Sequence, residues 1–192
     1  KGVRVVVLPD CVGIEVANRE PSIVPLKKTL NDDSFRNTKH ELPIAIGYTI
    51  TKKVKTFDLA SAPHLLVAGA TQQGKSVGLN VIISSLLYAK HPSELKFVFI
   101  DPKMVEFSVY NKLERHFLAK MESEDEAIVT DPKKAVYVLN SLVEEMGRRL
   151  VFCKVGTARF IVEYNVKFTA RRLNLNKGLR YLPYIVVIVD EF

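Results

Sequence analysis

The stretch of sequence that decides the fold is Gly69-Ala-Thr-Gln-Gln-Gly-Lys-Ser76. It fits the pattern G-x-x-x-x-G-K-[ST] of a phosphate-binding P-loop. The candidate nucleotide contacts are Gly69, Ala70, Thr71, Gln72, Gln73, Gly74, Lys75 and Ser76. An apolar run at 64–68, expected to be a strand, precedes the loop, and residues 75–90 follow it with apolar side chains at helical spacing. This strand, loop and helix order is the context in which such a motif binds phosphate.

Each residue type in the loop suits a nucleoside triphosphate. Glycines let backbone N–H groups turn toward the phosphates, and the following helix presents its positive end to them. Lys75 supplies a charge for the β and γ phosphates, and the Ser76 hydroxyl can coordinate Mg²⁺. The structural alternative is a glycine loop that merely packs a strand against a helix. The sequence predicts ATP and Mg²⁺ as cofactors.

A second polar element follows the β-branched run Tyr184–Val189, which is typical of a strand buried on both faces. Asp190 and Glu191 come directly after it, where ligands of open α/β sheets bind. Asp190 would hold Mg²⁺, directly or through water, and Glu191 would be the general base that polarises the attacking water. The predicted catalytic residues are thus Lys75, Asp190 and Glu191, and the predicted metal ligands are Ser76 and Asp190.

Two further positions stay open between a functional and a structural interpretation. Asp101 ends the predicted strand at 95–101 and begins Asp-Pro-Lys, which could support the phosphate site or a subunit contact, or could simply form a turn. Arg148 and Arg149 end a predicted helix at 132–152. They could compensate its dipole, the interpretation we favour, or reach a neighbouring subunit's nucleotide.

The remaining pattern predicts an α/β fold with a mostly parallel sheet, because strands alternate with helices from residue 63 onward. Further strands are expected at 3–8, 12–16, 42–48 and 54–58. The helix at 132–152 is expected to begin with Pro132 after a cap at Thr130 or Asp131 and to bury an apolar stripe. The stripe comprises Ala135, Val136, Leu139, Leu142, Val143 and Met146.

Composition narrows the possible partners. The 192 residues carry a net charge of +7, and 154–192 holds seven basic residues against three acidic ones. A basic face suits a polyanion such as DNA, although a merely soluble basic surface is an equal alternative. No apolar run approaches the ~18 residues of a membrane span. Cys11 and Cys153 show no metal spacing, and the start of the chain, which lacks Met, suggests a piece of a longer protein.

Several blocks together resemble the FtsK/SpoIIIE family of DNA translocases. They are Pro63–Thr71 with Gly74–Gly78, Phe99–Glu106 and Leu182–Phe192. Shorter blocks fall in the family's order between or before these, at 12–18, 131–135, 145–149 and 163–165.

The resemblance implies a RecA-like P-loop ATPase core at 43–192, truncated after the Asp-Glu strand. Residues 1–42 would be the end of a small α subdomain and a connector, a mixed α/β segment. It further implies a homo-hexameric ring that moves double-stranded DNA in chromosome segregation, at cell division or in sporulation. The motor would be cytoplasmic and tethered to the inner membrane only through an N-terminal region that this chain lacks.

Two departures from the family pattern leave other interpretations open. Gln72 stands where the family usually has glycine, which accepts positive φ more readily. The chain also stops directly after Asp190-Glu191. A related ring ATPase that moves protein or conjugative DNA is a second hypothesis, and a non-hydrolysing nucleotide-binding module is a third.

Overall fold

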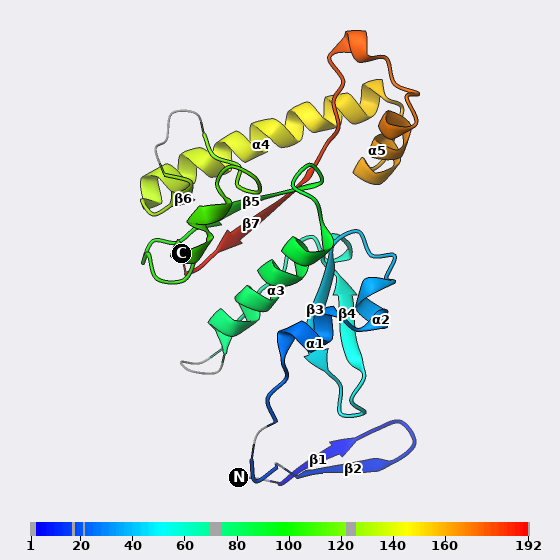
Figure 1. Ribbon diagram of the computed structural model, residues 1–192, viewed down its shortest axis with the longest axis vertical. Helices are drawn as coiled ribbons and strands as arrows, with labels where there is room; N and C mark the ends of the chain where they lie inside the picture. Colours follow the sequence, from blue (N-terminus) through cyan, green and yellow to red (C-terminus); the bar gives the residue numbers. More distant parts are fainter. Residues whose placement is uncertain (1–2, 17, 21, 70–73, 122–125, 192) are drawn as a thin grey trace. The chain divides into compact units, whose positions relative to one another are not determined.

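The computed structural model describes residues 3–16, 18–20, 22–69, 74–121 and 126–191. They form two compact units, Lys1–Ala89 and Lys90–Phe192 (Figure 1). Residues 70–73 of the predicted loop and residues 122–125 lie outside the described part of the chain.

The first unit opens with an antiparallel hairpin of β1 (Val3–Val7) and β2 (Val12–Val16). Alternate residues of a strand share one face, and the register places three apolar pairs opposite one another on the same face. The pairs are Val3 with Val16, Val5 with Ile14, and Val7 with Val12. All six of these side chains are exposed.

The rest of the first unit packs two short helices and a long one around a second hairpin. Its elements are α1 (Leu26–Leu30), α2 (Asp33–Arg36), β3 (Pro43–Tyr48), β4 (Val54–Asp58), the 3-10 turn η1 (Leu59–Ser61) and α3 (Lys75–Ala89). Leu30, Phe35 and Ala45 form one core cluster, so α1 and α2 pack on β3. The Asp58 carboxylate caps η1 and also accepts from the backbone N–H groups of Glu41 and Leu42, which joins the two ends of the hairpin region.

Helix α3 is fixed to β3 by a buried serine. Ser85 Oγ donates to Val81 O at 2.7 Å and accepts from Ala45 N at 3.2 Å. Leu79, Ile83 and Leu86 are buried on the same helix. The helix predicted at 75–90 is therefore confirmed, and its packing rests on these buried residues beyond its first turn.

The strand predicted at 64–68 is wrong. This segment has no regular secondary structure, and Leu66 is 90% exposed. A β-strand exists only where a neighbouring strand completes its hydrogen-bond ladder. Among the described residues no strand pairs with this segment, so β propensity alone did not decide its state.

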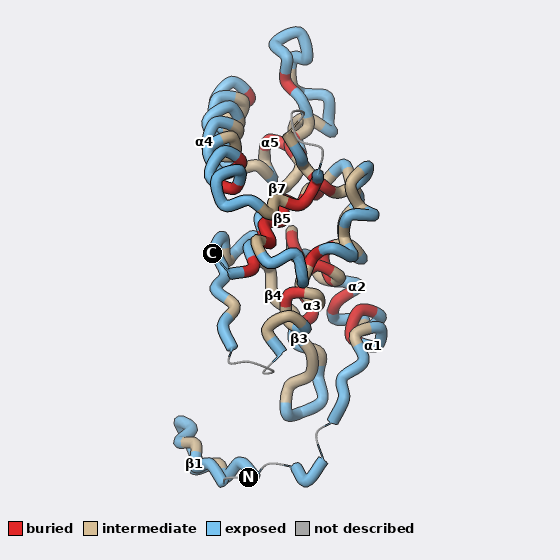
Figure 2. The backbone as a smooth tube through the Cα atoms, turned by 90° about the vertical axis from the view of Figure 1, so that its left-hand side faces the viewer, coloured by how far each residue is buried: buried red, intermediate tan, exposed pale blue. Residues whose placement is uncertain are grey.

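The second unit contains a parallel sheet in the order β6-β5-β7, which confirms the predicted α/β class. The strands are β5 (Leu95–Ile100), β6 (Ile128–Val129) and β7 (Tyr184–Val189). Strand β5 is central and is the most deeply buried element of this unit (Figure 2). The helical elements of the second unit are η2 (Ser108–Leu113), α4 (Pro132–Val155), α5 (Ile161–Thr169) and η3 (Leu175–Lys177).

Helix α4 begins as predicted but buries a different face. Asp131 is the cap and accepts from Lys133 N at 2.7 Å, with Pro132 in the first turn. Ala135, Val138 and the partly buried Leu142 pack in the core. The predicted stripe is therefore wrong in part, because four of its members are exposed, namely Val136, Leu139, Val143 and Met146. Val136, Leu139 and Val143 each directly follow a packed residue and so lie about 100° around the helix from it, and Met146 lies beyond the last packed residue.

Every helix within the described ranges is too short or too polar to cross a lipid bilayer.

Candidate functional site

The predicted phosphate loop meets α3 at Gly74, Lys75 and Ser76. Gly74 has φ of +89°, and a side chain at this position would meet no atom of the described residues within 4 Å. Glycine is therefore favoured here by backbone conformation rather than by space. Gly78 N donates to Gly74 O at 2.8 Å, which closes the first turn of the helix. The first N–H groups of a helix lack acceptors within it, so this end suits an anion.

The helix residues next to the loop are also held locally. Lys75 and Ser76 are half-buried, and Asn80 Nδ2 donates to Ser76 O at 2.9 Å. Gly69 is described and exposed, whereas the predicted contacts Ala70, Thr71, Gln72 and Gln73 lie outside the described residues.

In the second unit, the sheet brings two carboxylates to one edge. Ile100 pairs with Val189 in the parallel register, so Asp101 and Asp190 directly follow neighbouring strand ends. Asp190 N donates to Ile100 O at 3.0 Å and Asp101 N donates to Val129 O at 2.8 Å. Asp101 is fully buried and Asp190 is 4% exposed. Carboxylates buried this deeply at a strand edge are costly unless something compensates their charge.

Asp101 has a structural task in this arrangement. Its Oδ2 accepts from Glu106 N at 3.0 Å and from Phe107 N at 3.1 Å. Phe107 is itself buried, with its ring 5.0 Å from that of Phe99 on β5. Asp101 Oδ1 is buried without a hydrogen-bond partner among the described residues. The turn interpretation of Asp101 therefore accounts for one of its two oxygens.

Glu191 contacts Lys103, part of the Asp-Pro-Lys block that the sequence left open between a supporting role and a simple turn. Its Oε2 forms an ion pair with Lys103 Nζ, from the loop that follows β5. Both side chains are more than half exposed, at 54% and 61%. Glu191 also has φ of +50°. The signal for this contact was the Asp101-Pro-Lys103 block itself, since β5 and β7 were both expected to end at the same edge.

Arg148 and Arg149 belong to a charge cluster around Glu145. Arg149 Nε lies 2.9 Å from Glu145 Oε1, and its Nη1 donates to Pro183 O at 2.6 Å. Arg180 Nη2 lies 3.0 Å from Glu145 Oε1, and Arg148 lies 3.3 Å from the other oxygen. This geometry supports the structural interpretation, because Arg149 ties α4 to the segment that enters β7.

The arginines also govern the charge of Glu145. Burial alone would raise the pKa of this carboxyl, but the hydrogen bond and charge of Arg149, followed by the charges of Arg180 and Arg148, outweigh it and lower the pKa. Glu145 is consequently ionised in the folded state down to lower pH than an isolated glutamate.

Asn165 on α5 positions the same segment by a second route. Its Nδ2 donates to Leu182 O at 2.8 Å and its Oδ1 accepts from Leu182 N at 3.0 Å. Tyr164 OH donates to Arg180 O at 3.0 Å. Both residues are buried. In the sequence these two residues stood out only as part of the block at 163–165 that resembles the family. The one hint of this role was their position among the apolar residues of a short helix.

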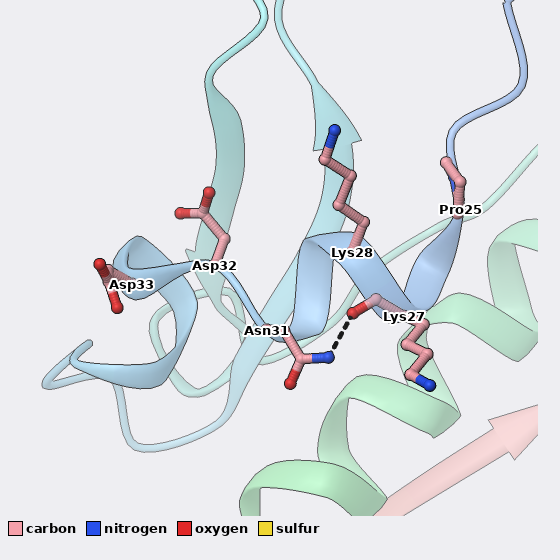
Figure 3. Close-up of a pocket in the computed structure, with 6 residues that line it drawn as sticks. All are labelled: Pro25, Lys27, Lys28, Asn31, Asp32 and Asp33. Atoms are coloured by element: carbon pink, nitrogen blue, oxygen red, sulfur yellow. Dashed lines mark hydrogen bonds between the residues drawn. The ribbon is translucent and has the colours of Figure 1, made fainter.

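A shallow hollow in the first unit has no residue in common with the predicted site (Figure 3). Its lining mixes two lysines and two aspartates, in the set Pro25, Lys27, Lys28, Asn31, Asp32 and Asp33. The Asp32 carboxylate is engaged as the cap of α2, and Asn31 Nδ2 donates to Lys27 O at 2.9 Å. These polar groups serve the two helix ends.

The P-loop sequence motif before α3 in the first unit, and the buried carboxylates at a parallel strand edge in the second, are each typical of P-loop ATPases. Among solved structures, the chain resembles the pCW3 conjugation coupling protein TcpA, solved as a monomer with ATPγS, with a TM-score of 0.63 and 26% identity over 90% of this chain and 40% of that one. The chain also resembles the cytoplasmic domain of the type VII secretion ATPase EccC of Thermomonospora curvata. The TM-score is 0.59 and the sequence identity 23%, over 88% of this chain and 19% of that one. The fold is that of a RecA-like core.

The chain belongs to the FtsK/SpoIIIE family, whose model matches residues 25–192. It is 42% identical to DNA translocase FtsK of Chlorobaculum tepidum, over 99% of this chain and 23% of the relative. It is also 42% identical to DNA translocase FtsK of Haemophilus influenzae, over 94% of this chain and 36% of that relative. The chain thus spans about a quarter to a third of these relatives.

Proposed function

We propose that this chain is the nucleotide-binding part of an ATP-driven motor that translocates double-stranded DNA in chromosome segregation. The observation that carries the proposal is the family match across 25–192, with curated relatives named DNA translocases over nearly the whole chain. The basic residues between α4 and β7 are compatible with sequence-independent contact to phosphate.

In this proposal the P-loop residues hold the triphosphate. Lys75 neutralises the β and γ phosphates, the backbone of 69–76 surrounds them, and α3 directs its positive end at them. Glu191 accepts a proton from the attacking water.

Mg²⁺ would be held by Ser76 and Asp190, whose oxygen donors are the type this ion prefers. The donor set fits, because Asp190 is a carboxylate almost fully buried at a strand end, where a divalent cation would compensate its charge. When bound, the ion would neutralise charge that develops on the phosphates.

The wider setting is part of the same proposal. The intact protein would act as a homo-hexamer whose cytoplasmic motor is tethered to the membrane by a region outside this chain. Residues 1–42 would end a small subdomain and 43–192 would form the ATPase domain. The packing of Leu30 and Phe35 on Ala45 would then be a contact between the two.

A second candidate is a motor for conjugative DNA or for a secreted protein. It is favoured by the resemblance to TcpA, which is a conjugation coupling protein. A motor for a secreted protein differs from either kind of DNA motor in its activator, since only a DNA motor gains turnover from duplex DNA.

The test is ATP hydrolysis by the longer protein with and without duplex DNA. We expect stimulation by DNA, no hydrolysis and weaker ATP binding in Lys75→Ala, and bound but uncleaved ATP in Glu191→Gln. Loss of one general base costs about a hundredfold to ten-thousandfold in rate. Normal turnover in Glu191→Gln would place the base elsewhere, and turnover indifferent to DNA would favour a protein substrate.

A further inference from the structure

The loop that follows β5 is built to hold one lysine in place. Asp101 Oδ2 binds the backbone N–H groups of Glu106 and Phe107, and Met104 N donates back to Asp101 O at 3.1 Å. Met104 has φ of +56°, a conformation that a non-glycine residue adopts only where its surroundings impose it. Lys103 therefore projects from a short turn whose base is a fully buried carboxylate.

The end of β7 brings Glu191 to that turn. The parallel register pairs Ile100 with Val189, so β5 and β7 run side by side (Figure 1). Asp190 N binds Ile100 O, so residues 101 and 190 leave the sheet next to each other. Glu191, one residue further, turns out of the strand with positive φ, and its Oε2 meets Lys103 Nζ. Two strand ends thus converge on one ion pair.

Fold stability gives little reason for this pair. Both partners are more than half exposed, and exposed ion pairs contribute about 0–1 kcal/mol. An ion pair of this kind does restrict a flexible carboxylate to one orientation. A general base needs that restriction, because proton transfer requires its oxygen within hydrogen-bond reach of the water.

We propose that Lys103 is a positioning residue for Glu191: by binding Oε2 it holds the carboxylate in the orientation that accepts a proton from water. The inference rests on the proposed role of Glu191 as the base. Lys103 acts through Glu191 and does not bind the nucleotide, so its loss lowers turnover without changing nucleotide affinity.

The experiment measures ATP turnover and ATP affinity in the longer protein carrying Lys103→Ala, Lys103→Arg or Lys112→Ala. Lys112 is a matched control, since it is an exposed lysine of the same unit at the end of η2. We expect Lys103→Ala to lower kcat about tenfold with KM unchanged, as misorientation forfeits part of the contribution of the base. Lys103→Arg keeps the charge and should recover most of the rate, while Lys112→Ala should behave as the parent.

A Glu191→Gln background separates this inference from the function on which it rests. There, Lys103→Ala should cause no further loss, because the group it positions is gone. If Glu191→Gln is inactive but Lys103→Ala keeps its kcat within twofold, the positioning role is overturned and the base survives. A changed KM with unchanged kcat in Lys103→Ala would also overturn the positioning role, because it would show that Lys103 binds the nucleotide. Normal turnover in Glu191→Gln would instead remove the base itself.

Discussion

At the scale of single residues, backbone conformation decides what the phosphate loop tolerates. Gly74 adopts φ of +89°, so an added methyl group would strain the backbone although it would touch none of the described residues. Gln72, two residues earlier, stands where the resemblance to the family implies that glycine is usual. If the loop needs a similar conformation there, Gln72 weakens binding through its backbone and not through its amide.

We therefore expect Gln72→Gly to tighten ATP binding. Strain of about 1 kcal/mol corresponds to roughly fivefold in affinity. The measurement is ATP titration of the parent and the variant, with Gly74→Ala as the opposite change, expected to weaken binding by a similar factor. Equal affinities for the parent and for Gln72→Gly, alongside a weakened Gly74→Ala, would show that residue 72 takes a conformation open to any side chain.

At the scale of elements, the sequence predicted the features that depend on side chains within one segment. It missed the features that depend on which other element the segment packs against. The cap at Asp131, the start of α3 at Lys75 and the strands β5 and β7 follow from side chains within each segment. Segment 64–68 has the same apolar character but no pairing strand in the described part of the chain. The buried face of α4 was likewise misjudged, because periodicity finds an apolar stripe without saying which side meets the sheet.

In the candidate site, too, the sequence predicted the residues of contiguous motifs but not the contacts between distant segments. The P-loop and Asp190-Glu191 could be found from spacing, since each motif is contiguous in sequence. The Lys103–Glu191 pair joins residues 88 apart, and Asn165 binds a backbone 17 residues away. The sequence blocks that contain Lys103 and Asn165 stood out, but which residue each of them contacts depends on strand register and helix packing.

Glu145 should make the contacts between α4 and the segment that enters β7 sensitive to acid. Its pKa is lowered in the folded state, so its contribution to stability is present above the unfolded pKa and is lost as pH falls through the folded value. Glu145→Gln should cost about 2 kcal/mol at neutral pH, the scale of a hydrogen bond to a charged group. It should also flatten the loss of stability on acidification.

Urea unfolding of this chain at a series of pH values, from neutral to below the usual glutamate range, measures both effects. Glu144→Gln is a suitable control, because Glu144 is the neighbouring exposed residue on α4. A pH dependence equally steep in Glu145→Gln and in the parent would assign the acid sensitivity to other carboxylates.

At the scale of the whole molecule, the basic residues of 154–180 predict how the intact motor binds DNA. A motor that ignores sequence should contact phosphate, and each such contact releases counterions. Duplex binding should then fall by about a thousandfold or more between ~50 and ~200 mM salt and should not depend on sequence. Fluorescence titration with two unrelated duplexes measures this, and an affinity flat across that range would argue for a protein substrate.

The N-terminal hairpin has a consequence for handling the chain in isolation. Six β-branched side chains share one face, and β1 and β2 pair only with each other among the described strands. Such a ribbon offers strand edges and an exposed apolar face, two features that favour edge-to-edge association into cross-β aggregates. On the opposite face, Arg4 stands across from Glu15, the one charged pair in its register. The charges of these two side chains oppose aggregation of the hairpin. A variant in which either one is replaced by an apolar residue should therefore form amyloid-like aggregates more readily.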